Sequence, residues 1–168
     1  RGKLAGAARG AAARWRPPEQ PMATDPRTAT AGPTERAVDL LAEAVWQWGL
    51  LESPITATYL GDRRGNGRLD EQGGAARARR LSAAKGFLKR LEALPLLPAS
   101  VSAGLTQRVL KVNLDDHCAE QVHRLWEQDV DQQFGLHLTL ANLMALQPVD
   151  TPADVSDVLS RLGEVPRA

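Results

Sequence analysis

Apolar residues recur at intervals of three and four positions through most of this 168-residue chain, and this spacing limits the folds open to it. It gathers apolar side chains on one side of an α-helix, whereas a half-buried strand alternates them at every second position. Proline or glycine follows most of these segments, which separates the helices. The sequence therefore predicts an all-α fold of about five helices in an irregular antiparallel bundle.

The first predicted helix begins at Pro33 or Thr34 and ends before Pro54. Its apolar side consists of Val38, Leu41, Val45, Trp48 and Leu51. The next stretch, SPITATYLG, suits either a strand or a short turn of helix that Gly61 stops. A second helix is predicted over residues 75–94, because Pro95 follows it.

Three further helices are predicted. The third begins near residue 100 or 102 and runs to Leu125 or Trp126, so it could exceed 25 residues. Segment 134–146 is almost entirely apolar and predicts a buried helix, although its first half also allows a strand. The last helix has Thr151 as N-cap and Asp154 as the capping-box acid. Its apolar side consists of Val155, Val158, Leu159 and Leu162.

Charge is distributed unevenly. Residues 1–21 contain five basic residues and one acid, so the remaining chain has 16 basic and 19 acidic residues and a formal charge of −3. We expect residues 1–32 to be a disordered or non-native leader and residues 33–168 to be one helical domain. The basic segment 63–90 and the acidic segment 115–131 would face each other if the second and third helices formed an antiparallel hairpin.

The same features exclude several classes of protein. A mildly acidic domain argues against a nucleic-acid partner. No apolar run approaches the roughly 18 residues that span a bilayer, so we expect no membrane partner. The single cysteine, Cys118, excludes an internal disulfide, and without a secretory signal we expect a cytoplasmic protein.

The glycine-rich stretch Tyr59–Glu71 resembles a ligand-binding loop only at first sight. A phosphate loop needs Gly-x-x-x-x-Gly-Lys between a strand and a helix, and this stretch has no lysine. A calcium loop needs a glutamate at its twelfth position, which is Gly73 here. We interpret the stretch as an ordered connector in which Asn66 and Gly67 take positive backbone angles.

Other candidate sites also have simpler structural explanations. Asp116, Glu120, His123 and Glu127 follow helical spacing and could hold a divalent metal, but a solvated acidic face explains them equally well. We expect His137 to be packed in the core with its nitrogen bonded to backbone. Cys118 and His117 point about 100° apart on a helix, too far for a nucleophile pair.

The tryptophans are more consistent with packing than with a base-stacking surface. Outside the leader, they are Trp46, Trp48 and Trp126. The sequence thus assigns no catalytic, cofactor-binding or metal-ligating residue.

Four segments form a recognisable order along the chain: LLESPITATYLGDRRGNGRLDE, FLKRLEAL, HRLWEQD and PVDTPADVSDVLSRLGEVPR. Taken in this order, they resemble the N-terminal helical part of the bacterial domain-of-unknown-function 885 family, and the similarity covers about residues 36–168. The residues that carry it are Pro54, Ala57, Thr58, Leu60, Gly61, Arg68, Leu69, Asp70, Trp126, Pro152, Asp154, Arg161, Leu162 and Pro166.

The resemblance implies a zinc metallopeptidase-like protein of the gluzincin type. Its zinc would sit on a His-Glu-x-x-Pro-Gly-His type motif far downstream of the matched region, and this chain has no His-Glu pair. No site residue therefore transfers, and we expect the chain alone to be inactive and without cofactor.

Two functions remain. In the first, the chain is the truncated N-terminal part of such an enzyme, and its helices shape or cover a substrate cleft. Its partners would then be the missing C-terminal part and, for the full-length protein, a peptide substrate. In the second, it is a free-standing helical module that binds a protein partner and has no enzymatic activity.

Overall fold

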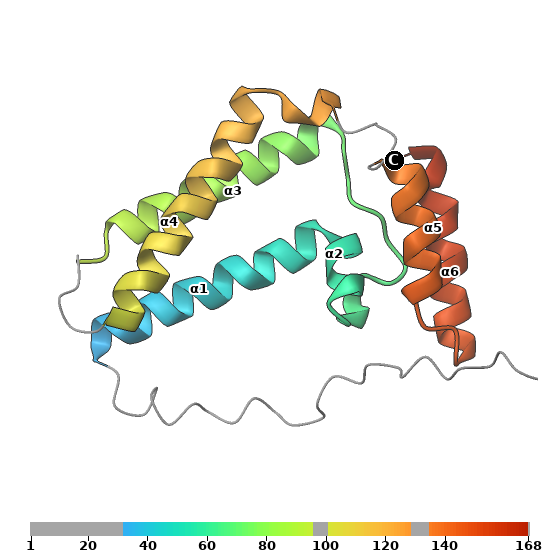
Figure 1. Ribbon diagram of the computed structural model, residues 1–168, viewed down its shortest axis with the longest axis horizontal. Coiled ribbons are helices and arrows are strands. Elements are labelled where there is room, and N and C mark those ends of the chain that lie inside the picture. The colour runs from blue at the N-terminus through green and yellow to red at the C-terminus, as the bar shows by residue number, and fades with distance from the viewer. Residues whose placement is uncertain (1–31, 96–100, 129–134, 168) are drawn as a thin grey trace, which may run out of the picture.

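Proline, glycine and capping residues divide the chain into helices as the sequence predicts (Figure 1). The structure, a computed structural model, describes residues 32–95, 101–128 and 135–167, and no strand occurs within them. The α-helices are α1 (Pro33–Glu52), α2 (Pro54–Tyr59), α3 (Gly74–Glu92), α4 (Val101–Val122), α5 (Leu136–Leu146) and α6 (Pro152–Glu164). The 3-10 turns are η2 (Arg63–Gly65), η3 (Leu125–Gln128) and η4 (Val165–Arg167). The all-α prediction is confirmed, and the leader up to residue 31 lies outside the described residues.

Two helices begin with hydrogen bonds between their N-cap and N3 residues, and those of α6 are reciprocal. At the start of α6, the Thr151 hydroxyl accepts the backbone N–H of Asp154, and the Asp154 carboxylate accepts the backbone N–H of Thr151 at 2.9 Å. At the start of α1, the Glu35 carboxylate accepts the backbone N–H of Gly32 at 2.9 Å. Such bonds satisfy N–H groups that a helix leaves without a partner, and each cap is worth about 1 kcal/mol. The predicted capping box of the last helix is confirmed.

Helices α1, α3 and α4 form a three-helix group. Its core is made by one leucine from each helix, Leu41, Leu91 and Leu110. The indole of Trp48 in α1 lies between Phe87 of α3 and His117 of α4, with ring centroids 5.4 and 5.6 Å away. Helices α3 and α4 run antiparallel and are in contact, as the hairpin prediction requires (Figure 1).

Among the residues that the structure describes, the basic side chains of α3 do not pair with the acidic segment as predicted. Arg79 and Arg80 of α3 form their ion pairs with Glu52 at the end of α1, at 2.9 and 3.4 Å. The guanidinium of Arg77 lies 4.7 Å from the centre of the Trp126 ring, a cation–π contact. Basic residues of α3 therefore connect it to α1 and to η3.

Two helices differ from their predictions. The third helix ends at Val122, because Arg124 takes a positive φ of 54° and η3 follows, so it is shorter than predicted. Segment 134–146 is helical over α5, but only Leu143 is buried among its described side chains, and Leu146 is exposed. The prediction of a buried helix there is wrong for this chain, because within the described residues few elements cover α5.

The second end of the molecule contains α2, η2, α5 and α6. Helix α2 continues from α1 after a break at Ser53 and contacts η2 and α5. Helices α5 and α6 lie beyond α2, away from the three-helix group (Figure 1). The connector between α2 and α3 runs past these elements and joins the two ends.

Candidate functional site

The connector Gly61–Glu71 is fixed to α2 by a carboxylate and a close backbone contact. Asp70 accepts the backbone N–H of Ile55 at 2.9 Å and the Ser53 hydroxyl at 2.7 Å, so it caps α2 from outside the helix. A Cβ on Gly65 would lie 2.9 Å from the Cα of Pro54, so only glycine fits at this contact.

The backbone angles of the connector correct one prediction. Asn66 has φ −61°, an ordinary right-handed value, and Gly67 is not among the described glycines with positive φ. The left-handed residue of the connector is Gly61, with φ 82°. Gly61 therefore makes the turn that follows α2, whereas Asn66 is buried and used for its polar atoms.

A buried arginine from α6 holds the connector in place. The Arg161 side chain is fully buried and donates four hydrogen bonds. Its Nε reaches the carbonyl of Arg68 at 2.8 Å and one Nη reaches Gln147 Oε1 at 2.7 Å. The other Nη reaches the Thr58 hydroxyl at 2.8 Å and the carbonyl of Gly65 at 2.6 Å. A single guanidinium thus joins α6 to α2, the connector and the α5–α6 turn.

Two neighbouring side chains complete this cluster, which we name the Arg161 junction and define as Thr58, Gly65, Asn66, Gln147 and Arg161. Gln147 donates its side-chain N–H to the carbonyl of Asn66 at 2.9 Å while its oxygen accepts from Arg161. The Thr58 hydroxyl lies 3.0 Å from both the Pro54 carbonyl and Asn66 Oδ1. Each polar side chain of the junction therefore has partners within it, as burial requires.

Charges around the junction favour its cationic form. Burial lowers the pKa of Arg161, but the carboxylates of Asp70, Asp157 and Glu164 act in the opposite direction. Arginine loses its proton only at very high pH, so the guanidinium stays charged. A buried cation bonded mainly to neutral carbonyl and hydroxyl oxygens is stable only while those oxygens stay in place.

A second bond pair joins α6 to the connector. The buried carboxylate of Asp154 forms an ion pair with Arg63 of η2. Burial opposes ionisation of Asp154, but hydrogen bonds from Thr151 and Arg63 outweigh it and lower its pKa. At the other end of α6, Glu164 accepts the backbone N–H of Leu69 at 2.6 Å.

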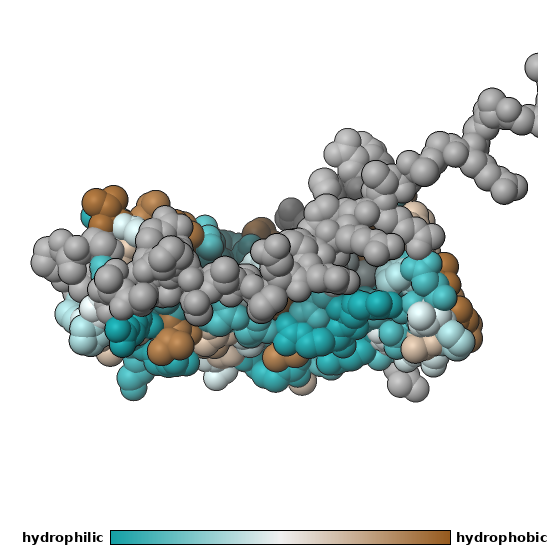
Figure 2. Space-filling model, turned by 90° about the horizontal axis from the view of Figure 1, so that it is seen from below, coloured by the Kyte–Doolittle hydropathy of each residue, from teal (hydrophilic) through white to brown (hydrophobic). Residues whose placement is uncertain are grey.

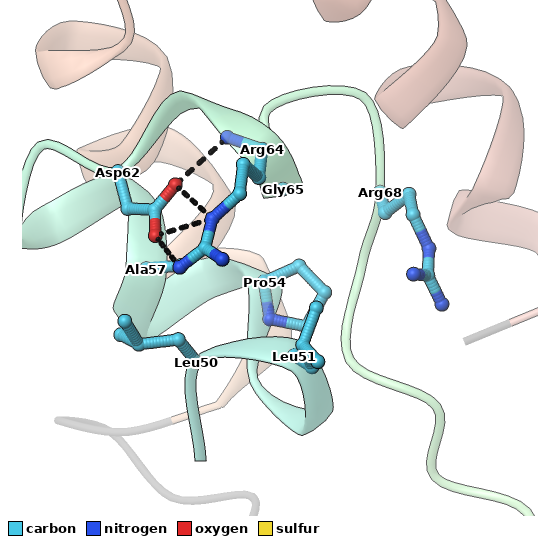
Figure 3. A pocket seen from close by; sticks show the side chains of 8 residues that line it. All are labelled: Leu50, Leu51, Pro54, Ala57, Asp62, Arg64, Gly65 and Arg68. Atoms are coloured by element: carbon cyan, nitrogen blue, oxygen red, sulfur yellow. Dashed lines mark hydrogen bonds and ion pairs between the residues drawn. The ribbon is translucent and has the colours of Figure 1, made fainter. Parts of the chain in front are cut away.

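The hollow beside the junction is too small for a substrate. It has a volume of about 20 Å³, enough for roughly one water molecule. Figure 3 shows the Arg64 guanidinium facing the Asp62 carboxylate within it, with Nε–Oδ2 2.9 Å, whereas Arg68 extends away from this pair. The hydrogen bond from Arg64 lowers the pKa of Asp62, so the pair is ionic, and Arg64 also donates to Gln47 Oε1 at 2.7 Å.

The junction gives α6 an unusual orientation. Its buried residues are the charged Asp154 and Arg161, seven positions apart and hence on one side of the helix. Its apolar side, predicted from the sequence, lies at the surface, with Leu159 64% exposed. We define the α6 apolar stripe as Val155, Leu159 and Leu162, all of which are exposed.

The structure separates the residues of the metal hypothesis. Asp116 and Glu120 are exposed on α4, whereas His123 and Glu127 follow its end, where Arg124 breaks the helical spacing. Glu127 instead forms an ion pair with Arg124. Within the described residues, no group of three or more His, Cys, Asp or Glu side chains could hold a metal ion. The donor set needed for the zinc that the resemblance implies is therefore not provided by this part of the chain.

The remaining candidate residues are either exposed or packed against other side chains. His137 is exposed on α5, so its prediction as a packed core histidine is wrong. His117 packs against Trp48 and lies 3.7 Å from the Glu120 carboxylate. Trp46 is exposed, and Trp126 lies under Arg77. None of these contacts brings a nucleophile and a base together.

Sequence reasoning from spacing missed Arg161 and Gln147 as site residues. An arginine in the last turn of a helix ordinarily reads as an exposed partner of the helix dipole. One signal was available: Arg161 lies two turns after Asp154, and both residues lie roughly a third of a turn around α6 from its apolar stripe.

A hollow of about 230 Å³ between α1 and α3, lined by Ala37, Leu40, Leu41, Arg90 and Leu94, is apolar and carries one cation.

Comparison with known proteins gives one match. A family model described as "Bacterial protein of unknown function (DUF885)" matches residues 54–168, which include every residue of the Arg161 junction. No curated protein and no solved structure is significantly similar to the chain. Over the described ranges, none of the helices has the length and apolar character needed to cross a membrane.

Proposed function

The chain belongs to the bacterial family of unknown function DUF885, and from this premise we propose that it is the helical part of a zinc metallopeptidase-like protein. Its helices shape or cover a substrate cleft, and the catalytic residues lie outside this chain. The peptidase chemistry rests on the family resemblance of segments such as LLESPITATYLGDRRGNGRLDE. The role within the protein rests on the geometry of α6.

The observation that carries this role is the reversed orientation of α6. An amphipathic helix at the surface of a globular protein typically packs its apolar side against the core. Here Arg161 and Asp154 are buried instead, and they hold the α6 apolar stripe at the surface. Exposed apolar patches on soluble proteins mark sites of contact with another structure. A rigid junction that presents such a stripe suits a helix that packs against the remainder of a larger protein.

The first test is the reading frame beyond Ala168. The proposal expects it to continue for several hundred residues and to encode a His-Glu-x-x-Pro-Gly-His type motif. A stop codon directly after Ala168, with the chain folded and binding another protein, would support the alternative of a free-standing interaction module.

The second test uses the protein that contains both parts. Leu159→Glu adds a charge to the α6 apolar stripe, so it should lower peptidase activity at least about tenfold or weaken cohesion of the two parts. Ser156→Glu adds the same charge outside the stripe and serves as the matched control. Equal activity of the two variants and the unmodified protein would contradict a covering role for α6.

A further inference from the structure

Helix α4 has a second apolar side that the three-helix group does not use. Its inner side buries Ala103, Leu110 and Leu114 against α1 and α3. Its outer side carries apolar residues that are exposed in the structure: Val101, Leu105, Val109, Val112 and Val122. Val101 is 91% exposed and Val122 is 75% exposed, so the first and last residues of the helix are not covered by the described residues.

Charged residues on the outer side of α4 are arranged in a specific order. At about 100° per residue, Val101, Arg108, Asp115 and Val122 lie at seven-residue steps along one line of the helix. Leu105, Val112 and Ala119 form a parallel line beside it at the same steps. Residues at seven-residue steps stay on one side of a helix, so both lines can face one partner helix along its length.

When two copies of this helix run in opposite directions, the first of these lines is complementary to itself. Reading from the start of α4, one line is apolar, basic, acidic, apolar: Val101, Arg108, Asp115, Val122. In an antiparallel partner of the same sequence, Val101 lies opposite Val122 and Arg108 lies opposite Asp115. The two-fold symmetry repeats each pair. Valines therefore meet at both ends of the contact, and an arginine meets an aspartate at each of the two central positions. A two-fold dimer needs a self-complementary surface of this kind.

We propose that the outer side of α4 binds a second copy of this chain, antiparallel, with Arg108 of each copy facing Asp115 of the other. This surface is separate from the α6 apolar stripe, so the inference goes beyond the proposed function. We define the α4 pairing surface as Val101, Leu105, Arg108, Val112, Asp115 and Val122.

Side chains of this surface are available for such contacts. Among the residues that the structure describes, Arg108 has no carboxylate partner and is exposed. Asp115 is half exposed and bonds Lys111 on its own helix at 2.7 Å, a pair that leaves its other oxygen open. Exposed pairs one helical turn apart contribute only about 0.3–0.5 kcal/mol, so an arginine from a second copy can join the carboxylate.

The surface also lies where a second molecule can reach it. Helix α4 contacts α1, α3 and η3 through its inner side and end, whereas α5 and α6 lie beyond α2 at the other end of the molecule (Figure 1). In the view of Figure 2, hydrophobic groups at the surface gather towards the two ends, with a hydrophilic stretch between them. On the face that Figure 2 shows, apolar exposure is therefore concentrated in patches.

The experiment measures molar mass by light scattering and sedimentation over about a hundredfold range of protein concentration. The unmodified chain should pass from monomer to dimer. Asp115→Arg should weaken the dimer at least about tenfold, because two arginines then face each other at each central position. Arg108→Asp should do the same. The double variant Arg108→Asp with Asp115→Arg should restore the dissociation constant to within about threefold, because it exchanges the charges and keeps them complementary.

Two controls separate pairing from folding and from general charge effects. Asp39→Arg makes the same change of charge at an exposed position of α1 and should leave the dimer unchanged. Circular dichroism and thermal unfolding should show that every variant keeps its helices. A chain that stays monomeric throughout overturns the proposal, as does a double variant that is as weak as the single variants. A dimer that Leu159→Glu dissociates but Asp115→Arg does not would place the contact on α6 and also overturn it.

Discussion

A cation without solvent contact is stable in this protein because its donors are matched to oxygen atoms. Moving an isolated charge into an apolar interior is prohibitively unfavourable, and hydrogen bonds to fixed oxygens are what make it tolerable. Arg161 has four such bonds, and three of its four acceptors lie 93 to 103 positions earlier in the sequence. Most of the bonds of Arg161 therefore lie outside its own helix, and they fix the position of α6 relative to the connector.

Replacing Arg161 by methionine tests this dependence. Methionine fills a similar space but leaves the carbonyls of Gly65 and Arg68 and the Gln147 oxygen without donors. The free energy of unfolding should fall by about 3–5 kcal/mol. Urea unfolding followed by circular dichroism measures the change. Arg161→Lys keeps the charge but has fewer and differently placed donors. Its free energy of unfolding should therefore lie between those of the original protein and the methionine variant. A methionine variant within about 0.5 kcal/mol of the original would show that the junction is not required for folding.

At the scale of elements, one carboxylate at the last position of α1 adds a polar contact with α3 to the apolar core that the two helices share. Glu52 accepts hydrogen bonds from Arg79 Nη2 at 2.9 Å and Nε at 3.2 Å, and lies 3.4 Å from Arg80. The hydrogen bond from Arg79 is the main cause that lowers the pKa of Glu52 below its ordinary value of 4.5. A carboxyl whose pKa is lower in the folded state stabilises that state above the unfolded pKa and loses the effect as pH falls.

This linkage predicts a pH-dependent difference between the original protein and Glu52→Gln. Near pH 7 the glutamine variant should be less stable, because the carboxylate contacts are lost. The difference should begin to shrink below about pH 4.5 and should vanish once Glu52 is protonated in the folded state too. Chemical unfolding at a series of pH values gives the difference directly. A difference that stays constant from neutral to acidic pH would show that Glu52 acts through packing alone.

Sequence alone predicted the elements whose signals are local. The start of α6 was predictable because Thr151 and Asp154 bond to each other across three positions, and the ends of α1 and α3 because proline follows each of them. The end of α4 was not, since it depends on the left-handed conformation of Arg124, which is not a glycine. The apolar side of α6 was identified correctly, but periodicity does not reveal whether that side is covered.

The site was less predictable than the elements for the same physical reason. Asp70 and Arg161 act on partners far away in the sequence, so no local pattern specifies their bonds. The Tyr59–Glu71 stretch was correctly interpreted as a connector rather than a ligand loop, yet its positive backbone angle falls at Gly61 and not at Asn66 or Gly67. The family resemblance covered Arg161 without indicating that it is buried.

For the whole molecule, stability comes from two different kinds of contact. The three-helix group has an apolar core around Leu41, Leu91 and Leu110, whereas the other end is held mainly by the polar Arg161 junction. A polar junction binds its helices without using their apolar sides. It thereby leaves the α6 apolar stripe at the surface, and the outer side of α4 is exposed independently.

Surface exposure on this scale should be visible in a dye-binding measurement. At a protein concentration low enough to keep the chain monomeric, a hydrophobic fluorescent dye should bind the folded chain at neutral pH, because the α4 pairing surface and the α6 apolar stripe offer apolar surface that the described residues do not cover. Combining Val112→Glu with Leu159→Glu should remove roughly half or more of the emission, whereas Ser156→Glu should not. Cooperative urea unfolding of the same samples distinguishes this signal from that of a molten globule, which also binds such dyes. A cooperatively folded monomer without dye emission would mean that the α4 pairing surface and the α6 apolar stripe are covered within the chain itself. Neither could then serve as a contact surface.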